Sequence, residues 1–197
     1  MLFGNNLEMV EAINSLKGNM PSDVEDVVVN LALQIMKLAG YNDISRNKIQ
    51  ILDIIKSGKA LEKFKELVKL QGGDISYIEN PEKFEKAPII TPIISETNGY
   101  IEELDAEIVG KVCLNLGAGR KNKEDVIDNR VGVILTRKIG DKIEKGEVIG
   151  YIHSNDINKT EAAMEMMKTA YKIGTKIKQK KNILDIIWFY YKGGKEE

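Results

Sequence analysis

The hydrophobic pattern of this chain changes its period near the middle, and no other feature constrains the fold as strongly. Before residue 74, apolar residues recur every three to four positions, which is typical of helices with one buried face. After residue 92, short apolar runs are bounded by glycine and aspartate, which is typical of strands joined by tight turns. Three of the four prolines, Pro81, Pro88 and Pro92, lie between these parts. The pattern predicts a mixed α+β chain with a helical part at 1–73, a connector at 74–92 and a second α/β domain at 93–197.

Four helices are predicted in the first part, and each is followed by glycine, which readily adopts the left-handed conformation that closes a helix. The first helix follows Gly4-Asn5-Asn6, and the second begins with a capping-box pattern of Ser22 and Glu25. The glycines that end the four helices are Gly18, Gly40, Gly58 and the pair Gly72-Gly73.

The second domain is predicted to combine short strands with two helices. One helix covers Asp105–Leu116, and another runs from Asn158 to about Lys176. Strands are predicted at Val131–Leu135 and Val148–Ile152. The apolar segment Ile183–Tyr191 fits either a strand or a helix.

The segment Val131–His153 resembles the barrel-sandwich hairpin of biotinyl and lipoyl carrier domains, so the second domain is predicted to be barrel-sandwich-hybrid-like. Carrier domains present a lysine just after the last of these strands. Here that position reads His153-Ser154-Asn155-Asp156, without lysine, and the later Met164–Lys168 falls on a predicted helix. These residues argue against a carrier function.

Charge and cysteine content narrow the function classes further. The net charge is -1, from 29 basic and 30 acidic residues, so no basic excess indicates nucleic-acid binding. The single cysteine, Cys113, forms no disulfide within the chain, which fits a reducing cytoplasm. No signal peptide is visible, and the longest apolar run, Ile186–Tyr191, is too short to cross a membrane. The chain is therefore expected in the cytoplasm, with neither nucleic acid nor membrane as a partner.

One loop and four side chains are candidates for chemistry, and each has a structural alternative. Paired glycines in the Gly117–Arg120 loop let backbone amides approach an anion, and arginine binds phosphate bidentately, but a glycine pair also simply ends a helix. Glu8 and Glu11 lie on one side of the first helix, either as favourable charge at its N-terminus or as a cation contact. Cys113 and His153 are predicted to be structural, because no nucleophile–base pair accompanies them.

Several collinear motifs together resemble one family, the pyrimidine-nucleoside (thymidine) phosphorylases, over its C-terminal half. Gly4–Ala12 resembles the GNxxEVxEA segment of that family, and Gly58–Phe64 and Gln71–Asp74 resemble its GKALEKF and QGGD stretches. Leu116–Arg120 and the strand end at Ile152–Asp156 continue the likeness in order.

The resemblance implies a pentosyltransferase that converts a pyrimidine nucleoside and the co-substrate phosphate into the free base and (deoxy)ribose 1-phosphate. In the family, substrates bind between a small helical domain and a larger α/β domain, and the enzyme is a homodimer. The phosphate-binding and base-binding residues of the family lie upstream of the GNxxE segment. The resemblance therefore implies a chain without catalytic residues of its own, inactive without the N-terminal half. The alternative is a non-catalytic binding or assembly module that retains the fold.

Two sets of residues are carried over from the resemblance. Glu11 and the backbone carbonyl of Leu2 match ligands of a monovalent cation, potassium, although the remaining ligands lie upstream, so the site here is incomplete. Gly117, Gly119 and Arg120 match a loop that orders when the domains close over substrate.

Overall fold

The computed structural model describes residues 1–177, and these divide into two compact units. Unit 1 combines Met1–Glu11 with the described residues from Glu82 onward, and unit 2 contains Ala12–Pro81. The boundary between Glu11 and Ala12 falls inside the helix Asn5–Leu16. The predicted segment Ile183–Tyr191 lies outside the described residues.

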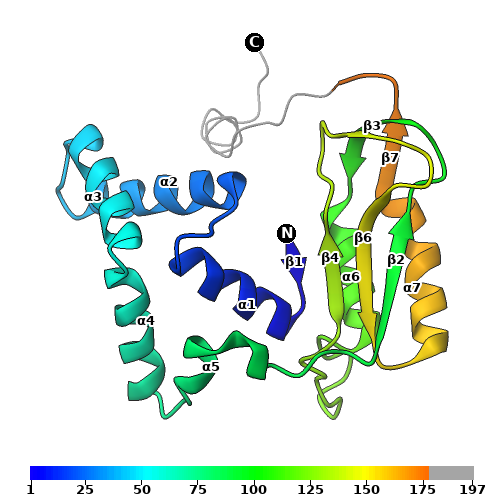
Figure 1. Ribbon diagram of the computed structural model, residues 1–197, viewed down its shortest axis with the longest axis horizontal. Coiled ribbons are helices and arrows are strands. Elements are labelled where there is room, and N and C mark those ends of the chain that lie inside the picture. The colour runs from blue at the N-terminus through cyan, green and yellow to red at the C-terminus, as the bar shows by residue number, and fades with distance from the viewer. Residues whose placement is uncertain (178–197) are drawn as a thin grey trace. The chain divides into compact units, whose positions relative to one another are not determined.

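Helices make up most of unit 2, as the periodicity predicts (Figure 1). In order they are the second part of α1 (Asn5–Leu16), α2 (Ser22–Leu38), α3 (Ile44–Lys56), α4 (Lys59–Leu70) and the short α5 (Ser76–Glu79). All four predicted helices are confirmed. The glycines that follow them take left-handed φ angles between 77° and 93°, at Gly18, Gly40, Gly58 and Gly72.

The capping box predicted at the start of α2 is absent. Ser22 is already the first helical residue, and Pro21 occupies the cap position without a side-chain hydrogen bond. The next helix is capped through its side chain instead, because Asp43 accepts a hydrogen bond of 3.0 Å from the backbone N–H of Arg46.

Unit 1 contains two antiparallel sheets. The first has the order β1 (Leu2–Phe3), β4 (Gly132–Leu135), β6 (Val148–Ser154) and β2 (Ile89–Ile94). The second has the order β5 (Lys142–Ile143), β3 (Gly99–Leu104) and β7 (Tyr171–Gly174). The predicted hairpin is confirmed in that β4 pairs with β6, but the chain adds β5 to the other sheet between them. Gly140 and Gly146, each with φ of 89°, make the two turns.

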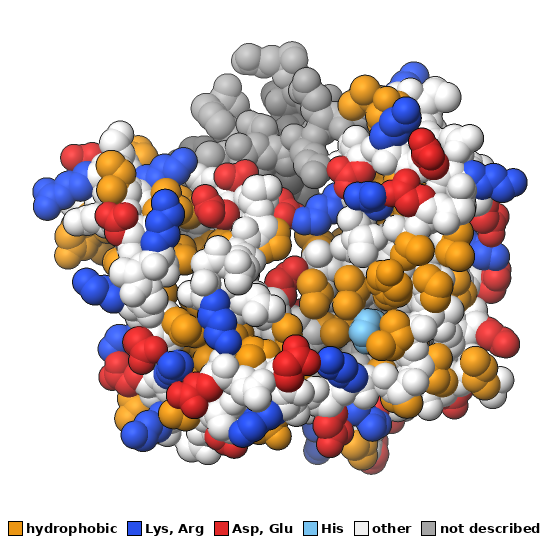
Figure 2. Space-filling model, viewed as in Figure 1, with side chains coloured by type: hydrophobic (Ala, Val, Ile, Leu, Met, Phe, Trp, Pro, Cys, Tyr) orange, Lys and Arg blue, Asp and Glu red, His pale blue; other side chains and the backbone are white. Residues whose placement is uncertain are grey.

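Two helices, α6 (Ala106–Leu116) and α7 (Ile157–Ala170), pack together on one face of the four-stranded sheet (Figure 1). Their apolar sides and the inner face of the sheet form the core of unit 1. Its fully buried side chains include Ile101, Val109, Val112, Leu116, Val133, Ile152 and Met167. Burying each such side chain contributes about 1.5–3 kcal/mol, so this cluster is the main source of stability in unit 1. In the space-filling view, apolar side chains also surround the single histidine, His153 (Figure 2).

The predicted helix Asn158–Lys176 is wrong beyond Ala170. Residues Tyr171–Gly174 form β7, which pairs with β3 through Leu104–Tyr171 and Ile101–Ile173. A partner strand from elsewhere in the chain thus overrides the local helical pattern.

The connector 74–92 contains α5, a short 3-10 helix at Pro81–Lys83 and the start of β2. Pro92 lies inside β2, opposite Tyr151. A proline lacks the N–H that a central strand needs, but β2 is an edge strand of its sheet. None of the helices within residues 1–177 combines the length and apolar composition that crossing a bilayer requires.

Candidate functional site

The N-terminal segment of the chain lies beside the end of α6, and a very close backbone approach makes this contact. Leu2 and Phe3 of β1 pair with Ile134 and Val133 of β4. A Cβ on Gly132 would lie 2.0 Å from the carbonyl oxygen of Phe3, and a Cβ on Gly4 would lie 2.4 Å from that of Val131. Only glycine fits at these two positions, so the Gly4 of the GNN segment sets how closely the two strands approach.

The predicted Gly117–Arg120 loop begins where α6 ends. Gly117 takes a left-handed φ of 111° and its N–H binds the carbonyls of Cys113 and Leu114, which closes the helix. The N–H of Asp128 then donates a hydrogen bond of 3.0 Å to the carbonyl of Gly117. The segment 117–128 is therefore a loop whose two ends are held together, in the manner of an Ω-loop.

Asn5 connects this loop to the N-terminal segment. Its side-chain amide donates to the carbonyl of Ala118 at 3.2 Å and to Oδ1 of Asn129 at 3.0 Å. The same two regions line a pocket of about 310 Å³, formed by Phe3, Gly4, Asn5, Glu8, Gly110, Cys113, Leu114, Ala118 and Gly119. Of the predicted loop residues, Gly119 contributes to this lining, whereas Gly117 and Arg120 do not.

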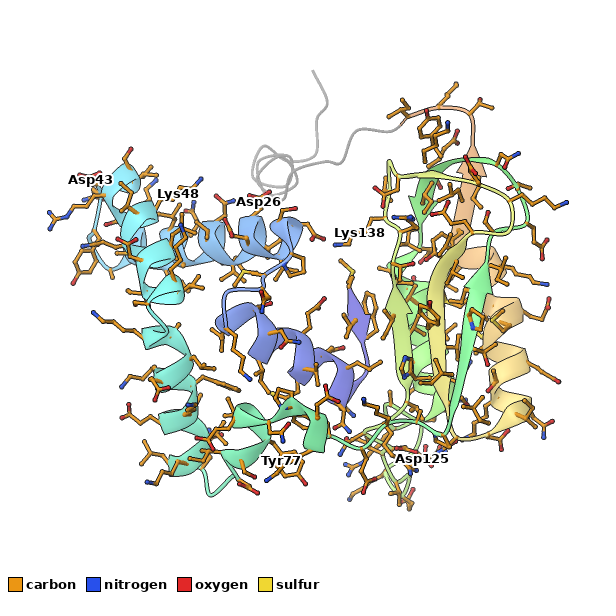
Figure 3. The ribbon with its side chains drawn as sticks, in the orientation of Figure 1. Asp26, Asp43, Lys48, Tyr77, Asp125 and Lys138 are labelled. Atoms are coloured by element: carbon orange, nitrogen blue, oxygen red, sulfur yellow. The ribbon has the colours of Figure 1, made fainter. Side chains whose placement is uncertain are left out.

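Arg120 is exposed and is held by the loop itself. Its Nε donates to the backbone carbonyl of Asp125 at 3.2 Å. The carboxylate of Asp125, which is labelled in Figure 3, accepts hydrogen bonds of 2.9 Å from the N–H groups of Lys121 and Asn122. These two bonds lower the pKa of Asp125. The amides that an external anion would use at this turn are thus already bound to a carboxylate of the same loop.

Asp128 holds the far end of the loop, and sequence reasoning did not single it out. Its carboxylate accepts bonds from Nε and Nη2 of Arg130, at 2.9 and 2.8 Å, and from the side-chain amide of Asn155, at 2.6 Å. The hydrogen bonds from Arg130 are the main reason that the pKa of Asp128 falls to about 2. Asn155 follows β6, so this carboxylate joins the loop to the end of the central strand pair.

The two residues predicted to bind a cation can be placed in unit 1. Oε1 of Glu11 is buried, makes no hydrogen bond and lies 3.5 Å from the Met1 ammonium nitrogen. Met1 and Leu135 exchange two backbone hydrogen bonds, of 3.2 and 2.9 Å. Because hydrogen-bonded and non-hydrogen-bonded pairs alternate in antiparallel strands, the Leu2 carbonyl points away from β4. Within residues 1–177, no three His, Cys, Asp or Glu side chains gather as a metal site. Oxygen atoms are the ligands that hard cations prefer, but two oxygens alone are a partial ligand set.

Cys113 is buried, as the sequence predicts for a structural thiol, and His153 lies near the end of β6, as predicted. Cys113 is 8% exposed, and burial is the main cause that raises the pKa of its thiol to about 11. His153 is also 8% exposed, and burial lowers its pKa. It lies on β6 between Ile90 and Gly132 of the neighbouring strands. The Met164–Lys168 segment lies on α7, so it is not the exposed turn of a carrier domain.

Comparison with known proteins finds relatives of this chain in one family. Residues 100–174 match the model of the pyrimidine nucleoside phosphorylase C-terminal domain. The chain is 44% identical over 153 residues to the pyrimidine-nucleoside phosphorylase of Staphylococcus epidermidis and 40% identical over 156 residues to that of Bacillus subtilis. This chain corresponds to the C-terminal part of the proteins in the pyrimidine-nucleoside phosphorylase family.

The match covers the relatives unequally. It includes 77% of this chain but 35% of the S. epidermidis protein, and 79% of this chain but 36% of the B. subtilis protein. The chain thus spans about a third of the length of the curated relatives it matches. The region matched by the C-terminal domain model begins within β3 and ends with β7, so it contains α6, the loop with Asp125 and Asp128, and the predicted closure residues.

Proposed function

We propose that this chain forms the C-terminal part of a pyrimidine-nucleoside phosphorylase. The reaction is phosphorolysis of a pyrimidine nucleoside, with phosphate as co-substrate, to the free base and (deoxy)ribose 1-phosphate. The observation that supports this proposal best is the identity of 40–44% with pyrimidine-nucleoside phosphorylases over more than three quarters of the chain.

Catalysis by this chain requires, in our proposal, the N-terminal part of such an enzyme. Phosphorolysis passes through a cationic sugar, so an enzyme must position phosphate and stabilise the charge on the departing base. In the loop of unit 1, Arg120 is bound to a backbone carbonyl, and the amides of Lys121 and Asn122 are bound to Asp125. The amides of Lys121 and Asn122 are therefore not available to phosphate, which favours a catalytic centre supplied by the other part.

The Gly117–Arg120 loop has, in this proposal, a role in closure. Gly119 lines the pocket beside the N-terminal segment, and Asn5 holds the neighbouring Ala118 carbonyl. A loop with both ends fixed and an exposed arginine can cover bound substrates without rebuilding its own structure. Covering the substrates excludes water from the reacting sugar, so water does not compete with phosphate for the cationic sugar.

Glu11 and Leu2 contribute, in this proposal, two oxygen ligands to a monovalent-cation site, with potassium as the ion. The support is the buried Glu11 oxygen that makes no hydrogen bond and the Leu2 carbonyl that points away from β4. In the chain alone, the Met1 ammonium nitrogen, 3.5 Å away, is the positive partner of this Glu11 oxygen. The remaining ligands would come from the N-terminal part.

Phosphorolysis of thymidine and uridine tests the proposal directly. The chain is assayed alone and after co-expression with the N-terminal part of the B. subtilis pyrimidine-nucleoside phosphorylase, the relative that is 40% identical. We expect free base and sugar phosphate only from the co-expressed pair. Activity of the chain alone would contradict the proposed dependence. Absence of activity from both preparations would contradict the proposed enzyme and favour a binding or assembly module.

A further inference from the structure

The two units differ in how they bury their apolar residues. Unit 1 has the large cluster formed by its sheets with α6 and α7. In the described part of unit 2, the buried apolar side chains are Ile13, Val29 and Ile78. Helix α4 has no buried residue, although it carries Leu61, Phe64 and Leu67. The helices of unit 2 therefore leave much of their apolar surface exposed to solvent.

Helix α2 concentrates this surface on one side. Val28, Leu31, Ile35 and Leu38 are 39%, 48%, 67% and 89% exposed. At about 100° per residue they fall within about 80° of the helix circumference, so they form one continuous stripe, called here the α2 stripe. A continuous exposed apolar stripe of this kind marks an interaction surface more often than a solvated face.

The same helix has a second apolar side. Val29 is 4% exposed, and Leu33 and Met36 are half-buried on that side, where α2 packs with the rest of unit 2. The polar residues Asp26, Asn30 and Lys37 occupy the remaining arc, and Asp26 is labelled on α2 in Figure 3. A helix with two apolar sides and a narrow polar arc is typical of a position between two layers, and the described residues supply only one of them.

We propose that the α2 stripe docks the N-terminal part of a pyrimidine-nucleoside phosphorylase, an inference that rests on the proposed function. The relatives have about two thirds of their length outside the region that this chain matches. Helix α2 lies between two segments that resemble the family, Gly4–Ala12 and Gly58–Phe64, so it belongs to the shared region. The acidic first turn, with Asp23 and Glu25, would be repelled by an anionic membrane surface, which favours a protein partner.

The test compares two double variants of the full chain. Leu31→Glu with Ile35→Glu places two charges in the α2 stripe. Asn30→Glu with Gln34→Glu places the same charges at the same spacing on the polar arc of the same helix. Neither pair changes a buried residue, and circular dichroism verifies that both variants keep the helical content of the wild type. Each chain is co-expressed with a tagged N-terminal part of the B. subtilis enzyme, and the co-purified amount and the phosphorolysis rate are measured.

We expect equal amounts of the wild type and the polar-arc variant to co-purify with the tagged part. The co-purified amount of the stripe variant should be at least ten-fold lower. Equal recovery of the stripe variant would overturn the docking proposal, even with full activity. Recovery that depends on the stripe without any phosphorolysis would support docking and contradict the proposed function. If the tagged part recovers no wild-type chain, the docking proposal fails. It also fails if light scattering shows that the stripe instead pairs two copies of this chain.

Discussion

At the level of single residues, the Asp128 carboxylate holds together three segments: its own loop, Arg130 before β4 and Asn155 after β6. We expect Asp128→Ala to lower the free energy of unfolding by about 1–3 kcal/mol, because it leaves hydrogen-bond donors of both partners unpaired. Urea denaturation of the two chains measures this difference. Asp128→Asn keeps the shape of the side chain, so we expect it to lower the free energy of unfolding by less than Asp128→Ala does. An unchanged midpoint in Asp128→Ala would show that the three segments hold without this carboxylate.

The same carboxylate predicts a pH dependence with a defined sign. Its pKa is lowered from an ordinary value of 3.8 to about 2, mainly by hydrogen bonds from Arg130. A lowered folded-state pKa stabilises the fold above about pH 4, and this contribution is lost as the pH falls through about 2. The stability difference between the wild type and Asp128→Asn should therefore be constant from pH 7 to 5 and shrink between pH 4 and 2. If the stability difference between the two chains stays constant down to pH 2, the pKa of Asp128 is not the source of this pH dependence.

Cys113 gives a prediction about reactivity. Burial and the nearby Glu8 raise the pKa of its thiol to about 11, so little thiolate is present at pH 8. We expect the native chain to react with a disulfide reagent such as dithionitrobenzoate far more slowly than the chain in guanidinium. Absorbance of the released thiolate follows both reactions. Equal rates in the two conditions would mean that the thiol is accessible and not part of the core.

The burial of Cys113 is predicted from the sequence, because its apolar neighbours are a local signal. The sequence does not identify the partners of Asp128, since Asn155 lies 27 residues away. The bond from Asn5 to Ala118 spans 113 residues. Which polar residues meet is decided by chain topology, and no periodicity of a single sequence reports it.

At the level of elements, the pairing of β1 with β4 depends on Gly132. A Cβ there would lie 2.0 Å from the Phe3 carbonyl oxygen, which is backbone and cannot turn aside. We expect Gly132→Ala to separate the strands and lower the free energy of unfolding by about 1–3 kcal/mol. The matched control is Gly110→Ala in α6, where a Cβ meets no atom within 4 Å. That change should be neutral or stabilise by up to about 1 kcal/mol, because alanine favours helices. Comparable losses in both variants in urea denaturation would contradict this explanation.

The long helices were predictable from sequence because many residues share one period, as in α2 and α6. Strands of two to four residues, such as β1, β5 and β7, are too short to show a period. The segment Tyr171–Gly174 continues the apolar spacing of α7, so the sequence predicts a helix where the structure has β7. Its pairing with β3, more than 60 residues earlier, decides its conformation.

At the level of the whole molecule, the sequence predicts a helical part followed by a mixed domain, and the structure has both. The sequence does not predict which of the two units the first eleven residues join. Met1–Glu11 belong to unit 1, because β1 completes its four-stranded sheet, and α1 then continues into unit 2. The helical period of residues 1–73 gives no sign of this two-residue strand.

The unequal cores of the two units predict unequal local stability. Unit 1 closes its own core, whereas α2, α3 and α4 each bury at most one residue and leave Leu31, Ile35 and Leu38 exposed. Segments with few buried apolar contacts open with a lower free energy than core strands. In hydrogen exchange of the chain alone, the amides of α2–α4 should therefore exchange at least ten-fold faster than those of β4, β6 and α6. If the N-terminal part of the relative covers the α2 stripe, its presence should slow exchange in α2 and leave α6 unchanged. Uniform protection of both units in the chain alone would show that unit 2 is stable without a second layer, and would remove the structural reason for a docking partner.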